Sequence, residues 1–127
     1  MAILLKRPTS NVSEFFGRLM QITGKAHLTH LRQYTKSGWE HKALNTLYED
    51  IVDIVDGIIE SWQGIYGLID IKIPETVAEP DAITFISSLY SYIQANRNIF
   101  SESWIQNEID NACMLLAQTL YRLKYVQ

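Results

Sequence analysis

Three histidines and a pair of acids are the residues of this sequence whose types and spacing suit metal chemistry. His27, His30 and His41 fall within 15 residues, and Asp56 and Glu60 follow, four residues apart. Residues three or four apart project to one side of an α-helix. Neutral imidazoles together with carboxylates suit iron, manganese or zinc. The pattern therefore predicts either a metal site or, more simply, polar residues on the solvated side of two helices.

The two acids belong to a longer acidic stripe. Successive spacings of 4, 3 and 4 residues separate Glu49, Asp53, Asp56 and Glu60, which puts them within about 60° of one another around a helix. Apolar residues recur on the opposite side with the spacing of a core-facing helix, and these are Leu44, Leu47, Ile51, Val55, Ile58, Trp62 and Ile65. The acids are therefore expected outside the core, facing solvent or a partner.

Helical periodicity covers most of the chain, and each periodic segment begins at residues that favour helix starts. The third and fourth segments are expected to be joined by a short turn around residues 96–98. Four helices are predicted, over residues 9–34, 37–66, 81–96 and from about 103 almost to the C-terminus. Their expected capping residues are, in the same order, Asn11 with Glu14, Ser37 with Glu40, Asp81, and Ser103 with Gln106.

The lengths of the connections predict the topology. Short links join helices one and two and helices three and four, which favours antiparallel hairpins. Residues 68–80, with Pro74 and Pro80, should form an extended connection that includes, as an alternative, a short strand. With 127 residues, 47% of them hydrophobic, the chain fits one domain spanning 1–127. The expected fold is an all-α, ferritin-like antiparallel four-helix bundle with one long crossover connection.

Two stretches carry a family resemblance. Lys25-Ala26-His27, then His41, then Asp56-x-x-x-Glu60, resemble the ferroxidase signature of the Dps miniferritins, and the likeness covers about residues 10–67. The chain is also similar to a phage-associated family of Dps-like proteins. The residues that carry this second likeness are Thr35-Lys36-Ser37, His41-Lys42-Ala43-Leu44, Tyr48, Asp56, Glu60 and Gln63-Gly64.

The resemblance implies an iron site shared between subunits. Its metal ligands would be His27 and His41 of one chain and Asp56 and Glu60 of another, with His30 as an auxiliary ligand. Carboxylates and imidazoles would hold Fe(II) with open positions for oxygen or peroxide, and oxidation to Fe(III) would sequester the iron. Zinc and manganese are the alternative metals. A homo-oligomer formed through the hairpin of helices one and two follows from such a site.

The sequence departs from the Dps pattern at several positions. The interval from His27 to His41 is two residues longer than is usual in that family, and Leu28 stands where a tryptophan is common. Asn45 stands where an aspartate is usual. Trp39 or Tyr34 would take the place of the redox-active aromatic residue.

Composition and charge exclude several other classes. A net charge of −3 and the absence of a Lys-rich tail argue against DNA binding by a basic tail. No apolar run approaches a membrane span, and the single cysteine, Cys113, has the apolar neighbours of a buried thiol. We expect a soluble cytoplasmic protein without membrane contact. The alternative function is a ferritin-like structural or interaction protein of a phage, a virion or assembly component with phage structural partners and no catalytic activity.

Overall fold

The computed structural model describes residues 9–31, 38–76 and 81–126. Within these ranges the chain is helical and contains no β-strand, which confirms the all-α class and shows that the alternative of a strand is wrong for residues 68–76. A short 3₁₀ helix, Arg97–Ile99, follows the third helix at the predicted turn. The four helices are α1 (Thr9–Leu31), α2 (Gly38–Tyr66), α3 (Ala82–Asn96) and α4 (Ser103–Tyr125).

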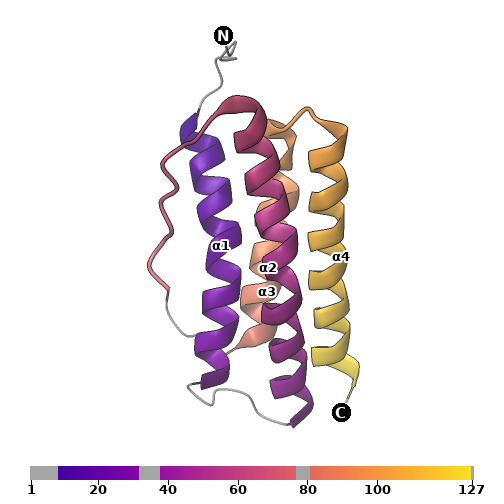
Figure 1. The fold of residues 1–127 in the computed structure, drawn as a ribbon. Helices are drawn as coiled ribbons and strands as arrows, with labels where there is room; N and C mark the ends of the chain where they lie inside the picture. The colour runs from indigo at the N-terminus through magenta and orange to yellow at the C-terminus, as the bar shows by residue number, and fades with distance from the viewer. Residues whose placement is uncertain (1–8, 32–37, 77–80, 127) are drawn as a thin grey trace.

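The helices form two antiparallel hairpins (Figure 1). Helix α2 packs against α1 and α4, and α3 packs against α4 and α1. After α2 the chain passes along the outside of α1 before α3 begins, so α2 and α3 run in the same direction. The long connection therefore spans the length of the molecule, as its residue count predicted.

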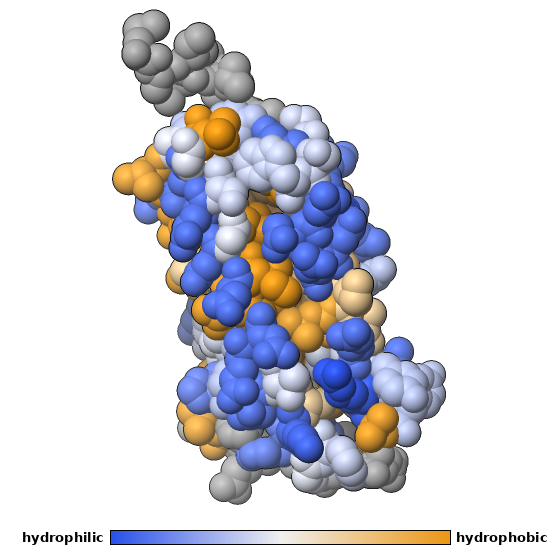
Figure 2. Space-filling view, turned by 45° about the vertical axis from the view of Figure 1, so that its right-hand side comes forward, coloured by the Kyte–Doolittle hydropathy of each residue, from blue (hydrophilic) through white to orange (hydrophobic). Residues whose placement is uncertain are grey.

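One hydrophobic core joins all four helices. The ring of Phe16 packs edge to face on Trp62 at 5.7 Å between centroids, and Phe15 does the same with Phe100 at 5.1 Å. Apolar side chains reach the surface between α2 and α4, where Figure 2 shows them between two polar flanks. The predicted core residues Leu44, Leu47, Ile51, Val55, Ile58 and Trp62 are all buried.

Two apolar residues of the helices lie at the surface. Ile65 is 59% exposed, so its assignment to the core-facing side of the second helix is wrong, and Trp104, near the start of α4, is 41% exposed although helical periodicity placed it on the buried side. At the last turn of α2 the core position belongs to Tyr66, which packs on Trp62 and donates a hydrogen bond to the Glu102 carboxylate. Because Tyr66 turns inward, its neighbour Ile65 turns out.

Among the predicted helix caps, the cap of α3 is confirmed. Asp81 caps α3, where its carboxylate accepts from the Thr84 backbone N–H at 3.4 Å. The predicted capping box Ser103-x-x-Gln106 is wrong, because α4 has Glu102 at its N-cap, without a side-chain cap, and Gln106 donates to the carbonyls of Arg97 and Phe100. The box at Asn11 is also wrong, because α1 already begins at Thr9. Ser37 and Tyr34 lie outside the described residues.

Side chains of α1 hold the crossover segment in place. Ser13 Oγ donates to the carbonyl of Asp70, and Gln21 Nε2 donates to that of Glu75 at 2.8 Å. Between them, a Cβ atom added at Gly17 would lie 2.1 Å from the carbonyl oxygen of Lys72. Hydrogen bonds from side chains of α1 thus satisfy backbone carbonyls of the crossover segment, which forms no β-ladder among its described residues. The close approach of this segment to α1 requires a glycine at position 17.

Substituting Gly17 tests this approach. Gly17→Ala should lower the free energy of unfolding by about 1 to 3 kcal/mol, because the new methyl group overlaps backbone that cannot move without losing its hydrogen bonds. Gly57→Ala is the matched control, since a Cβ there meets nothing within 4 Å, and it should stabilise α2 by about 0.5 to 1 kcal/mol. Urea unfolding followed by circular dichroism measures both. Equal effects from the two variants would contradict the contact.

Truncation of a core residue tests the assignment of the apolar face of α2. Ile58 is 1% exposed, so Ile58→Ala should destabilise the protein by about 2 to 5 kcal/mol through lost burial and the cavity left behind. The exposed Ile65 is the matched control, and Ile65→Ala should cost less than about 0.5 kcal/mol. The same denaturation experiment compares them.

Candidate metal site

The predicted histidines lie on the outer side of α1 and α2. His27 of α1 is exposed, and its imidazole stacks on the ring of Tyr48 in α2, with 4.6 Å between centroids and 23° between planes. His41 is exposed in the first turns of α2. His30 belongs to α1, but its side chain is outside what the structure describes. The stacking places His27 about two helical turns along α2 from His41.

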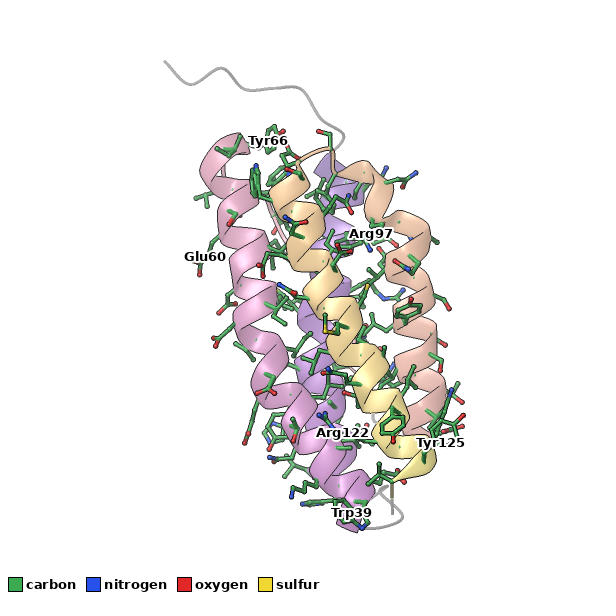
Figure 3. All side chains as sticks on the ribbon, turned by 90° about the vertical axis from the view of Figure 1, so that its right-hand side faces the viewer. Trp39, Glu60, Tyr66, Arg97, Arg122 and Tyr125 are labelled. Atoms are coloured by element: carbon green, nitrogen blue, oxygen red, sulfur yellow. The ribbon has the colours of Figure 1, made fainter. Side chains whose placement is uncertain are left out.

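The acidic stripe faces away from the core, as predicted. Glu49, Asp53, Asp56 and Glu60 are all exposed, and Figure 3 shows Glu60 projecting from the outer side of α2. A shallow hollow of about 160 Å³ lies beside Asp56 and is lined also by Met20, Thr23, Val52 and Val55. Asp56 thus borders a small apolar depression between α1 and α2.

The geometry of α2 keeps the predicted ligands apart within one chain. His41 and Asp56 are separated by 15 residues of one helix, which correspond to a rise of about 22 Å. A metal ion bound by both would need donor atoms about 2 Å from it. Within the described ranges no group of three ligating side chains comes together. One chain therefore carries the histidines and the acid pair of the predicted site at separate places on its surface.

Asn45 is held by two neighbours on α2. Tyr48 Oη donates to Asn45 Oδ1 at 2.7 Å, and Asn45 Nδ2 donates to Glu49 Oε1 at 3.1 Å. With the stacked His27, these residues form a continuous row from α1 to the acidic stripe. Sequence reasoning named these three residues separately and did not connect them, although spacings of three and four residues were the signal that Tyr48 and Glu49 would reach Asn45.

Two groups with shifted pKa values lie away from this face. Burial raises the pKa of the Cys113 thiol, an effect that Arg97 opposes and Asp110 reinforces. The thiol is buried, as predicted, and a protonated thiol is a poor metal ligand. Burial also raises the pKa of Tyr92, with Glu14 adding to the rise and Arg18 opposing it. Neither group contributes to the surface that carries His27, His41 and the acidic stripe, which we call the α1/α2 face.

A larger hollow of about 460 Å³ lies where the start of α2 meets the end of α4. Lys42 and Arg122 bring positive charge to it, and Lys42 Nζ lies 5.7 Å from the centre of the Trp39 ring. Sequence reasoning missed this hollow because its two sides lie more than 70 residues apart. Its lining among the described residues is Trp39, Lys42, Ala43, Thr46, Gln118, Tyr121, Arg122 and Val126.

The fold and this surface define the class as an all-α protein of four helices with an outward-facing row of acids and histidines. The chain belongs to a family of unknown function, DUF5856, whose model matches residues 30–123. The match contains His41, Asp56 and Glu60, whereas His27 lies before it. No curated protein and no solved structure matches the sequence. Among the described helices, none is both long and apolar enough to cross a membrane.

The contacts of Asn45 can be tested by stability. Asn45→Asp removes the donor to Glu49 and places two carboxylates one turn apart, so it should lower the free energy of unfolding by about 0.5 to 1.5 kcal/mol at low salt. Added salt should reduce the loss. Adding Glu49→Gln removes the repulsion and supplies a new donor, so the double variant should recover most of the stability. If single and double variants unfold alike, the contact contributes nothing.

Proposed function

We propose that this protein is a ferritin-like, Dps-like bundle that binds Fe(II) between two copies of the chain and oxidises it. The observation that carries the proposal is the 15-residue separation of His41 from Asp56 on one exposed helix face. A single chain cannot bring these two residues together, but a second copy related by a two-fold axis can place its acids beside His41. If two α2 helices pair antiparallel about a point near residues 49 and 50, His41 of one copy lies beside Asp56 and Glu60 of the other.

Each copy would then contribute to two equivalent sites. His27 and His41 would supply imidazole nitrogens, and Asp56 and Glu60 of the second copy would supply carboxylate oxygens, a donor set suited to Fe(II) with open positions. Iron is the substrate of the reaction. Two Fe(II) ions give up one electron each, and one hydrogen peroxide with two protons accepts both electrons to give two water molecules. Zinc and manganese suit the same donors.

The acidic stripe makes such pairing dependent on a cation. An axis near residues 49 and 50 brings Glu49 and Asp53 of both copies toward one another, and like charges facing across an interface oppose association. A bound divalent cation offsets this repulsion. Association through the α1/α2 face should therefore need metal.

Metal binding by matched variants tests the proposal. Anaerobic calorimetry with Fe(II), or with Zn(II) as a redox-inert probe, should give one ion per chain and metal-induced growth in mass. Asp56→Ala with Glu60→Ala should abolish binding at the shared site. Glu49→Ala with Asp53→Ala is the control, since these acids have the same spacing on the same stripe, and it should leave binding intact. Equal losses from both pairs would contradict a defined site.

Single variants then resolve the role of each histidine and of Asn45. His41→Ala should weaken binding most, because His41 lies opposite the acids, and His27→Ala less. Asn45→Asp adds a carboxylate one turn from His41 and should tighten binding or speed Fe(II) oxidation by peroxide, followed by the near-ultraviolet absorbance of Fe(III).

The second candidate function is that of a structural or interaction protein, in a phage virion or its assembly, without catalysis. The hydrogen bonds of Asn45 favour it, because they occupy the residue that stands where the Dps family has a carboxylate. This function should replace the first if neither the wild type nor Asn45→Asp takes up metal while Asp56→Ala and Glu60→Ala leave assembly unchanged.

A further inference from the structure

The outer face of α4 carries a regular row of exposed residues that contains no charge. Their spacing alternates between three and four, the repeat of a coiled-coil seam. Among them Trp104 is 41% exposed, Met114 57%, Tyr121 60% and Tyr125 72%. We call this row the α4 stripe, and its members are Trp104, Asn107, Asn111, Met114, Gln118, Tyr121 and Tyr125.

The charges of α4 lie beside the stripe and are sorted by sign along the helix. The helix has four charged residues. Glu108 and Arg122 are on one side of the stripe, and Asp110 and Lys124 are on the other. Both acids are in the N-terminal half and both cations in the C-terminal half. The outer face of a surface helix is ordinarily charged or polar, whereas four of the seven residues of the α4 stripe are exposed large hydrophobic or aromatic side chains. This composition favours a face that a partner covers.

We propose that the α4 stripe pairs antiparallel with the α4 stripe of a second copy. In the register centred near residue 116, Glu108 of one copy lies beside Arg122 of the other, and Asp110 beside Lys124. The two-fold axis repeats each pair, which gives four opposite-charge contacts around the stripe. A parallel, in-register pairing would instead put Glu108 beside Asp110 of the second copy and Arg122 beside Lys124, so that like charges meet. The charge pattern therefore selects both the partner and the direction.

The same register gives the polar residues of the stripe suitable partners. Met114 faces Gln118 of the second copy near the axis, and Asn111 faces Tyr121. Asn107 faces Tyr125, and Trp104 packs against the end of the second α4. Amide and phenol groups can hydrogen-bond across these layers, and polar residues at seam positions fix the register of helix pairs. Antiparallel helices also oppose their dipoles favourably.

The surroundings of Arg122 also suit an acidic partner at this place. Arg122 borders the hollow of about 460 Å³, which contains Lys42 and no acid among its described lining residues. Figure 3 shows Arg122 and Tyr125 at the end of the molecule where Trp39 starts α2. The carboxylate of Glu108 from the second copy would meet positive charge there.

The mass of the full chain in solution tests the pairing. Sedimentation equilibrium in the presence of EDTA removes any metal-dependent association through the α1/α2 face, so the two interfaces are measured separately. The wild type should have twice the mass of the 14.6 kDa chain. Met114→Glu brings two carboxylates within about one turn of each other across the axis and should yield monomers. Met20→Glu, the same change on α1, is the control and should leave the dimer intact.

A charge exchange tests the register and does not depend on one variant folding normally. Glu108→Arg and Arg122→Glu should each weaken the dimer about tenfold or more by placing like charges together. The double variant Glu108→Arg with Arg122→Glu should restore it. A monomeric wild type in EDTA overturns the proposal, as does dissociation by Met20→Glu but not by Met114→Glu. With a monomeric wild type, a different protein or a small molecule would be the occupant of the stripe. A dimeric wild type whose double variant is as weak as the single variants overturns the antiparallel register.

Discussion

The stiffness of a single long helix constrains most of this molecule. Helix α2 has 29 residues, which gives a rod of about 43 Å, and it contacts both α1 and α4. Because its hydrogen bonds hold it straight, every residue on it has a fixed height and direction. The positions of the buried residues of α2, from Leu44 to Trp62, therefore also fix the positions of the outward-facing acids. The same rigidity separates His41 from Asp56, so one chain cannot bring both side chains to one metal ion.

The crossover is the second constraint, because it decides which helix faces stay open. It covers one side of α1, where Gly17 admits the backbone of Lys72 and Ser13 and Gln21 bind its carbonyls. That cover leaves the outer sides of α2, α3 and α4 exposed. At the opposite hairpin, Arg97 binds Gln106 and Asp110 and fixes the turn from α3 into α4. Among these exposed faces, those of α2 and α4 differ in chemistry.

These two faces suit different kinds of association. The α1/α2 face is acidic, and the contact between copies proposed there would need a cation to offset the repulsion of its carboxylates. The α4 stripe is uncharged and flanked by charges of both signs, so the contact proposed for it would form without a ligand. Two such two-fold contacts on one subunit would together build assemblies larger than a dimer. The match to DUF5856, a family of unknown function, covers α2 and the α4 stripe as far as Tyr121, and it leaves out His27 and Tyr125.

The amino-acid sequence by itself determined the helical class, the approximate ends of the helices, the buried face from Leu44 to Trp62 and the exposure of the acidic stripe. These features follow from local periodicity, which repeats every few residues and needs no knowledge of distant segments. Only the tertiary structure decided that Tyr66 and not Ile65 turns inward, and that Trp104 is exposed. The tertiary structure likewise decided that Gln106 donates hydrogen bonds to backbone carbonyls of the turn before α4. It also decided that Tyr48 stacks on His27 and that Lys42 and Arg122 share one hollow. Each of these depends on which distant side chain arrives at a given place, and periodicity carries no information about that.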